Sequence, residues 1–297
     1  MSLATLLDDP DTILRAWPTK PTMFHRHPKT LRPLLTREEV DDLIDSGCLP
    51  MRNVALLAEG KPVDPRTYAG KDDMPRSGAL REHFEKGGTI SLRGLEKMKP
   101  SLATLHREVS LETGYRTHVN AYYTPAGQQG LRYHFDPYVT LILQVAGQKA
   151  WPTHPPFVEN PVREHGSYHL IGFTAEQLHY LANTPPAETY TLEPGSVFWL
   201  PRGYVHAPYA VGVEPSLHIT LALKERTWQW LAGQLAEGVV AEALKDPGMR
   251  EAIPPAVLLG DPGDAIRDMR DYLVGALKNY DPEVAADLIR AAALRTS

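Results

Sequence analysis

The sequence predicts a mainly β core of the barrel or jelly-roll kind, with helical flanks. Between residues 115 and 223, seven short β-type runs alternate with Gly, Pro and Asn. So many short strands in so little chain favour a closed barrel or a double-sheet sandwich. We therefore expect three regions: a helical or irregular flank over 1–114 that packs on the barrel, the β core over 115–223, and a C-terminal helical region over 224–297.

Local patterns define the elements of these regions. Thr36 and Glu39 form a capping-box pattern, which predicts a helix that ends near Gly47. Strands are expected over 52–58 and 89–93, and an amphipathic helix from Pro100 to about Gly114. The seven core strands are expected over 117–123, 138–145, 149–153, 167–172, 188–192, 195–201 and 216–223.

Composition excludes several classes of protein. The chain has 31 basic and 36 acidic residues, a net charge of −5, and no long basic run, so we expect no direct binding of nucleic acid. Neither a membrane-spanning apolar run nor a secretory leader pattern is present. The single cysteine, Cys48, rules out an intrachain disulfide and a cysteine-based zinc site, and we expect a cytoplasmic protein.

The main chemical signal is a pair of histidines with one aspartate. His134 and Asp136 are two residues apart, so in a strand both side chains point to the same face. His206 follows after 72 residues, in a proline-bounded loop behind a buried strand. Two imidazoles and one carboxylate form the facial triad of mononuclear non-haem Fe(II) oxygenases. The plain alternative is that His134 and Asp136 are surface groups or a hydrogen-bonded core pair.

Lys149 is the second signal. It begins a strand just after the strongly apolar run over 138–145 and a glycine-containing turn. A lysine that enters an apolar barrel is costly unless it is paired, and the distal carboxylate of 2-oxoglutarate is a suitable partner. The alternative is that Lys149 points outward at the end of the hairpin.

An ordered set of motifs resembles one family. The set comprises Asn120-Ala121-Tyr122-Tyr123-Thr124-Pro125, the segment from Gly127 to Gly130, His134-Phe135-Asp136, the run over 143–151 that contains Lys149, Pro201-Arg202-Gly203 with His206, and Ser216-Leu217-His218-Ile219-Thr220. In this order the motifs resemble the JmjC/cupin-type 2-oxoglutarate oxygenases, and within them the ribosomal-oxygenase branch of protein hydroxylases. The resemblance is close over residues 115–223.

The resemblance implies a double-stranded β-helix that binds Fe(II) through His134, Asp136 and His206. Lys149 then holds 2-oxoglutarate, and Thr220 lies near this cosubstrate. Two further groups of residues have open alternatives. Asn120 and Tyr122 share one strand face and line the pocket or pack in the barrel, while His218 lines the pocket or is a satisfied core histidine. His25 and His27 form an H-x-H pair in an irregular region without a third ligand nearby, and no motif includes His154, His165, His169 or His179.

By resemblance, the reaction consumes Fe(II)-bound 2-oxoglutarate and O₂, hydroxylates a side chain of a protein or peptide, and releases succinate and CO₂. The substrate is a ribosomal protein or a biosynthetic precursor peptide. Three alternatives stay open: a hydroxylase of a free amino acid or small metabolite, a non-catalytic metal-binding cupin that acts as a sensor or scaffold, and a Zn or Mn cupin that catalyses isomerisation or hydrolysis.

The C-terminal region has an apolar pattern with helical spacing, formed by Leu231, Leu235, Val239, Val240 and Leu244. This face either packs on the barrel or mediates self-association. Related enzymes dimerise through such a region, so the resemblance implies a homodimer.

Overall fold

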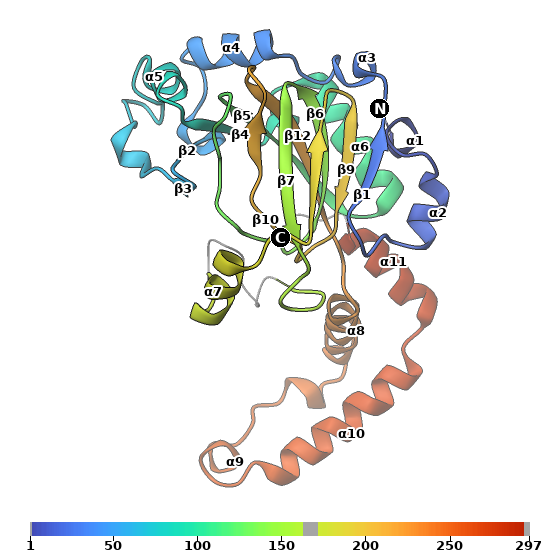
Figure 1. Ribbon diagram of the computed structural model, residues 1–297. Coiled ribbons are helices and arrows are strands. Elements are labelled where there is room, and N and C mark those ends of the chain that lie inside the picture. The colour runs from blue at the N-terminus through green and yellow to red at the C-terminus, as the bar shows by residue number, and fades with distance from the viewer. Residues whose placement is uncertain (1, 163–171, 294–297) are drawn as a thin grey trace. The chain divides into compact units, whose positions relative to one another are not determined.

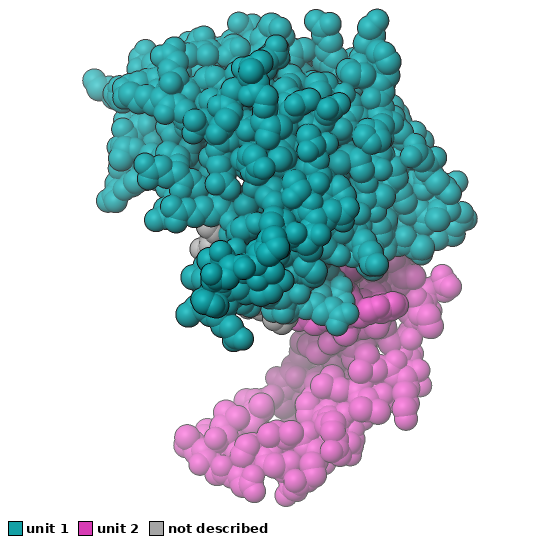
Figure 2. Space-filling model, viewed as in Figure 1, with its two compact units in different colours: residues 1–113, 117–224 teal, residues 114–116, 225–297 magenta. Residues whose placement is uncertain are grey.

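The computed structural model describes residues 2–162 and 172–293. The chain divides into two compact units, coloured separately in Figure 2. Unit 1 comprises Met1–Thr113 and Thr117–Lys224, and unit 2 comprises Gly114–Arg116 and Glu225–Ser297. The strand expected over 167–172 lies outside the described residues except for Gly172, as do His165 and His169.

Within the described residues, the larger sheet has eight strands (Figure 1). Their order across the sheet is β1 (Thr22–His25), β9 (Ser196–Leu200), β6 (Val139–Ala146), β12 (Ser216–Lys224), β5 (Arg116–Thr124), β4 (Thr89–Arg93), β2 (Val54–Ala58) and β3 (Lys61–Pro62). Residues 1–114 therefore do more than pack on the barrel, because four of their segments are strands of its larger sheet.

The smaller sheet is built around β7 (Gln148–His154). On one edge β7 pairs with β8 (Glu188–Leu192), and on the other with β10 (Val205–His206) and β11 (Tyr209–Val211). All of these pairs are antiparallel. Together the two sheets form the jelly-roll core that the pattern of short strands predicts.

The apolar run in β6 is buried on both of its faces, which explains why it lacks polar alternation. Leu141 and Leu143 belong to the large hydrophobic cluster formed with the N-terminal helices. Ile142, between them, points the other way and packs with Trp151 of the smaller sheet. Alternating strand geometry thus makes β6 the wall between the main core and the interior of the barrel.

The N-terminal helices confirm the local patterns. Thr36 and Glu39 form a complete capping box at the start of α4 (Arg37–Asp45). The amphipathic helix α6 (Pro100–Thr113) buries Leu102 and Val109. The remaining helices of unit 1 are α1 (Leu3–Leu6), α2 (Pro10–Arg15), α3 (Pro28–Leu31), α5 (Ala79–Glu85) and α7 (Ala175–Asn183), with 3₁₀ turns η1 (Met51–Asn53), η2 (Pro65–Thr67) and η3 (Leu95–Lys97).

Unit 2 is helical. It contains α8 (Trp228–Ala243), η5 (Gly248–Arg250), α9 (Pro255–Leu259), α10 (Gly263–Asn279) and α11 (Pro282–Ala293). Both α10 and α11 contact α8. Of the apolar positions expected in α8, Val239 is buried, whereas Val240 and the following Leu244 are more than half exposed. None of the helices among the described residues combines the length and apolar character that crossing a membrane requires.

Candidate metal centre

Backbone hydrogen bonds bring the two histidines and the aspartate together. His134 and His206 form an antiparallel bridge, with N–H to carbonyl distances of 3.0 and 2.8 Å. The N–H of Gly203 donates to the carbonyl of Asp136 at 2.8 Å. Gly203 has φ +83°, and a Cβ there would lie 2.7 Å from Pro161, so this turn requires glycine.

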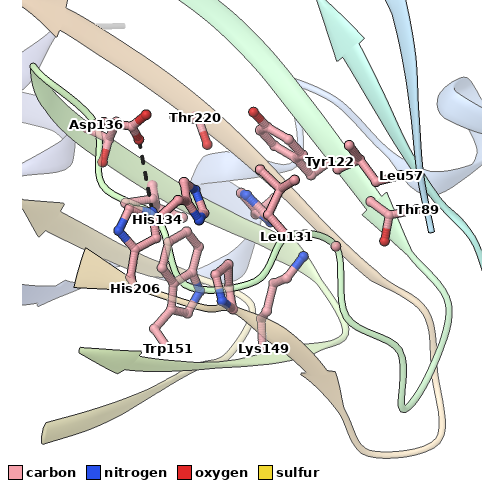
Figure 3. A pocket seen from close by; sticks show the side chains of 15 residues that line it. Leu57, Thr89, Tyr122, Leu131, His134, Asp136, Lys149, Trp151, His206 and Thr220 are labelled. Carbon is pink, nitrogen blue, oxygen red and sulfur yellow. Dashed lines mark ion pairs between the residues drawn. The ribbon is translucent and has the colours of Figure 1, made fainter. Parts of the chain in front are cut away.

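The three side chains converge on one point. One ligand atom from each of His134, Asp136 and His206 lies within 4.8 Å of the others. The Nε2 atom of His206 is 4.0 Å from Oδ2 of Asp136, and the two imidazole centroids are 4.2 Å apart (Figure 3). Among the described residues, no other group of three metal-ligating side chains has this proximity.

Hydrogen bonds fix the tautomer of both imidazoles. Nδ1 of His134 donates to the carbonyl of Arg132 and Nδ1 of His206 to that of Tyr204, each at 2.8 Å. The proton therefore sits on Nδ1 and the lone pair on Nε2, the arrangement by which outer hydrogen bonds orient ligating histidines.

Burial keeps the imidazoles of His134 and His206 neutral. Desolvation lowers the pKa of His134 to about 4. Desolvation, reinforced by the neighbouring His134, lowers the pKa of His206 well below its usual value. Two neutral nitrogens with one carboxylate oxygen are the donor set that suits a mononuclear non-haem ferrous ion.

Lys149 lies on the far side of the same pocket from Asp136 (Figure 3). Its side chain is buried, and Nζ donates to Oγ1 of Thr124 at 2.8 Å, which also accepts from Oγ1 of Thr89 at 3.1 Å. No carboxylate among the described residues pairs with Lys149, and desolvation lowers its pKa to about 7. The outward orientation is therefore wrong, and the pocket contains an amine without a counter-anion.

Several other residues that the sequence singles out line this pocket. Tyr122 and Thr220 do so, and so does His218, which resolves the open alternative for that histidine in favour of the pocket. Asn120 is not among the residues that line it, and its Oδ1 accepts from the N–H of Gly94 at 3.2 Å. Tyr122 and Asn120 share a strand face as expected, and of the two only Tyr122 lines the pocket.

Two functional neighbours escape sequence reasoning. Thr124 holds Lys149, and its only signal is that it follows Tyr122 by two residues on the same strand face. Trp151 lies over His206, with ring centroids 5.5 Å apart and an interplanar angle of 27°. The indole follows Lys149 by two residues, so the same strand periodicity points to it.

Among the described residues, His25, His27, His154 and His179 do not belong to the group of three converging side chains. His25 and His27 are exposed, and Nδ1 of His27 accepts from the N–H of Lys29 at the start of α3. His179 is exposed on α7, next to Asn183. His154 is buried, with edge-on contacts to the rings of Tyr133 and Tyr180.

Comparisons with known proteins agree with this geometry. Residues 97–231 match the model of the JmjC domain family. Ribosomal oxygenase 2 of Rattus norvegicus is 26% identical over 269 residues, which cover 86% of this chain and 55% of that protein. The bifunctional lysine-specific demethylase and histidyl-hydroxylase NO66 of Aedes aegypti is 25% identical and covers 82% of this chain and 38% of that protein. The chain thus spans about half or less of the length of these relatives.

Solved structures share the fold. The ribosomal oxygenase YcfD from Escherichia coli, in complex with cobalt and 2-oxoglutarate, has a TM-score of 0.52 at 18% identity, covering 93% of this chain and 68% of that chain. The matched domain contains the converging triad and the buried lysine. Residues 97–231 therefore resemble a JmjC domain, and the chain is similar to the ribosomal oxygenases over most of its length.

Proposed function

We propose that this protein is an Fe(II)- and 2-oxoglutarate-dependent oxygenase that hydroxylates a side chain of a protein or peptide and releases succinate and CO₂. One observation carries the proposal. A single pocket has a His-Asp-His cluster on one side and, on the other, a buried lysine for which the described residues provide no counter-anion (Figure 3).

The metal would be held by Nε2 of His134, Nε2 of His206 and a carboxylate oxygen of Asp136. Two neutral ligands and one anion leave the site with a net positive charge, which favours binding of an anionic keto acid. When bound, the ferrous ion and 2-oxoglutarate supply the oxygen activation that protein side chains cannot provide.

The other side of the pocket would bind the distal carboxylate of 2-oxoglutarate. Lys149 provides a charge-assisted hydrogen bond, which is stronger than a neutral one. Thr124 fixes the position of the Lys149 amine through the 2.8 Å hydrogen bond from Nζ to its Oγ1. The free amine has lost its hydration without gaining an anion, so binding of the carboxylate restores favourable electrostatics to it.

Differences in exposure suggest where the substrate approaches. The side chains of His134 and His206 are almost completely buried, whereas 28% of the Asp136 side chain is exposed. Trp151 and Ile142 line the interior and exclude water. The side chain to be hydroxylated would therefore reach the metal from the Asp136 side.

The relatives favour a macromolecular substrate. Their names describe ribosomal oxygenases and a histidyl-hydroxylase that is also a lysine-specific demethylase. For this chain we accordingly propose a side chain of a ribosomal protein or of a biosynthetic precursor peptide.

Turnover of 2-oxoglutarate tests this function. Purified protein supplied with Fe(II), 2-oxoglutarate and O₂ should release succinate, and candidate peptides should gain the mass of one oxygen atom. His134→Ala and Asp136→Ala should abolish succinate release. His25→Ala, which changes an exposed histidine away from the pocket, is the matched control. Tight binding of 2-oxoglutarate without any succinate would instead indicate a sensor, and activity that needs no 2-oxoglutarate would indicate another metal cupin.

We also propose that unit 2 mediates a homodimer. On α10, Ile266, Met269 and Leu277 lie within about 80° of the helix circumference and are 61%, 41% and 45% exposed. An apolar stripe of this kind is unusual on a monomer surface. A second copy provides the same stripe, so a two-fold axis lets the two stripes bury each other.

A further inference from the structure

His218 is a buried polar residue of the pocket, and it has no role in the proposed binding of the metal by the triad or of the carboxylate by Lys149. It lies on β12, where the pairing with β6 shifts register between Leu217 and His218. Such a bulge redirects side chains and is frequent beside active sites. Because side chains alternate along a strand, His218 and Thr220 point into the pocket, while Leu217 and Ile219 join the hydrophobic cluster on the opposite face.

Two aromatic contacts hold the His218 ring in one orientation. The ring of Tyr122 is stacked on it, with centroids 5.1 Å apart and an interplanar angle of 13°. The ring of Trp151 meets it edge-on, at 5.4 Å and 75°. Trp151 in turn lies over the candidate ligand His206, so the imidazole has a fixed place next to the metal centre.

One ring nitrogen of His218 is left without a hydrogen bond by the part of the chain that the structure describes. The residue is 2% exposed, and its Nδ1 has no partner among the described residues. A buried polar atom without a partner is destabilising, and in a native structure it indicates an absent water, ion or ligand. The indole N–H of Trp151, in the same pocket, is also buried without a partner. Two unpaired polar atoms in one pocket indicate a ligand with several acceptor oxygens.

The surrounding charges indicate that this ligand is an anion. Burial lowers the pKa of His218 well below its usual value, and Lys149 lowers it further, with a smaller effect from His206. The ring is therefore neutral and offers one N–H and one lone pair. Next to a lysine without a counter-anion, the N–H is the useful group, because an oxygen bound to the ammonium can accept from the imidazole as well.

We propose that His218 is a further cosubstrate-positioning residue, whose ring N–H donates to the same carboxylate that Lys149 binds. The inference rests on the proposed function, because it presupposes that a keto diacid such as 2-oxoglutarate occupies this pocket. Lys149 attracts the distal carboxylate by its charge, and the imidazole, held by Tyr122 and Trp151, donates a directional hydrogen bond. Together they fix the orientation of the distal carboxylate.

Two substitutions separate the hydrogen bond from the packing. His218→Phe keeps an aromatic ring for Tyr122 and Trp151 and removes the N–H. His218→Asn places a carboxamide nitrogen near the position of Nδ1 and restores a donor. Thermal melting of both variants shows whether the barrel remains folded.

Equilibrium binding of 2-oxoglutarate to the Mn(II)-loaded full chain gives a readout that does not need turnover. His218→Phe should weaken this binding about tenfold or more, as loss of a hydrogen bond to a charged group does, while its affinity for Mn(II) alone stays unchanged. His218→Asn should recover most of the lost affinity.

Three results would overturn the role of His218. They are wild-type 2-oxoglutarate affinity in His218→Phe, an equal loss of affinity for Mn(II), and no recovery in a folded His218→Asn. Failure of the proposed function is recognised separately, because in that case the wild-type protein itself would not bind 2-oxoglutarate when loaded with Mn(II).

Discussion

Replacing Lys149 by methionine should weaken binding of 2-oxoglutarate and stabilise the ligand-free protein. Methionine has similar length and no charge, so it fills the buried space while removing the ammonium group. Loss of a charge-assisted hydrogen bond costs about 1.5–3 kcal/mol, which corresponds to roughly tenfold to hundredfold weaker binding. Calorimetric titration of 2-oxoglutarate into Mn(II)-loaded protein measures this loss directly.

The effect on stability follows from the depressed pKa of Lys149. Burial lowers this pKa from 10.5 to about 7. Between these two values the unfolded chain binds a proton that the folded chain does not bind, so the ligand-free protein loses stability as the pH falls. Integrated over the titration, this loss amounts to about 2 kcal/mol between pH 9 and pH 7. The Lys149→Met variant has no amine at this position, so its stability lacks this dependence on pH.

Urea unfolding of the metal-free proteins at the two pH values provides the assay. The difference in unfolding free energy between Lys149→Met and wild type should grow by about 2 kcal/mol in favour of the variant as the pH falls from 9 to 7. Lys71→Met, at an exposed lysine, is the control and should follow the wild type. Parallel pH profiles for wild type and Lys149→Met, together with unchanged affinity for 2-oxoglutarate, would refute the reasoning.

Three other predictions concern the metal, the proton balance and the assembly. Asp136→Ala should lose most of the Mn(II) affinity measured by titration, and wild-type affinity in this variant would exclude Asp136 as a ligand. Binding of 2-oxoglutarate at pH 8 should take up about 0.9 of a proton, because Lys149 with a pKa of about 7 is mostly neutral before binding and becomes protonated beside the carboxylate. Calorimetric titrations in buffers of different ionisation enthalpy measure this uptake. Release of protons on binding would contradict it. Light scattering should show a dimer for wild type and a monomer for Leu277→Glu, whereas a wild-type monomer at all concentrations would remove the dimer proposal.

The sequence indicates the centre of the site because its chemistry depends on local geometry. The two-residue spacing of His134 and Asp136 predicts that an extended segment presents both side chains on one face. In the structure His134 is an isolated bridge residue and Asp136 lies in the loop that follows it, so the bridge to His206 positions the pair. The position of Lys149 after a strongly apolar strand similarly indicates a buried amine. Both inferences need only strand periodicity and the cost of burying charge.

Features that depend on pairing between distant segments were not predictable in this way. Strand periodicity puts Asn120 and Tyr122 on one face of β5, but it does not say which of the two lines the pocket. The strands β10 and β11 span two and three residues, which is too short for any alternation to be visible. The pairing of β1 with β9 joins residues far apart in the chain, so no local pattern reveals that the N-terminal region completes the larger sheet.

The central claim is that His134, Asp136 and His206 bind one metal ion in a pocket whose other side binds a carboxylate. Anomalous diffraction at the iron edge, from crystals grown without oxygen in Fe(II) and 2-oxoglutarate, tests it most directly. A single peak in bonding distance of both Nε2 atoms and an Asp136 oxygen, with 2-oxoglutarate density reaching Lys149, is the predicted result. An iron peak elsewhere, or 2-oxoglutarate bound outside this pocket, would contradict the account.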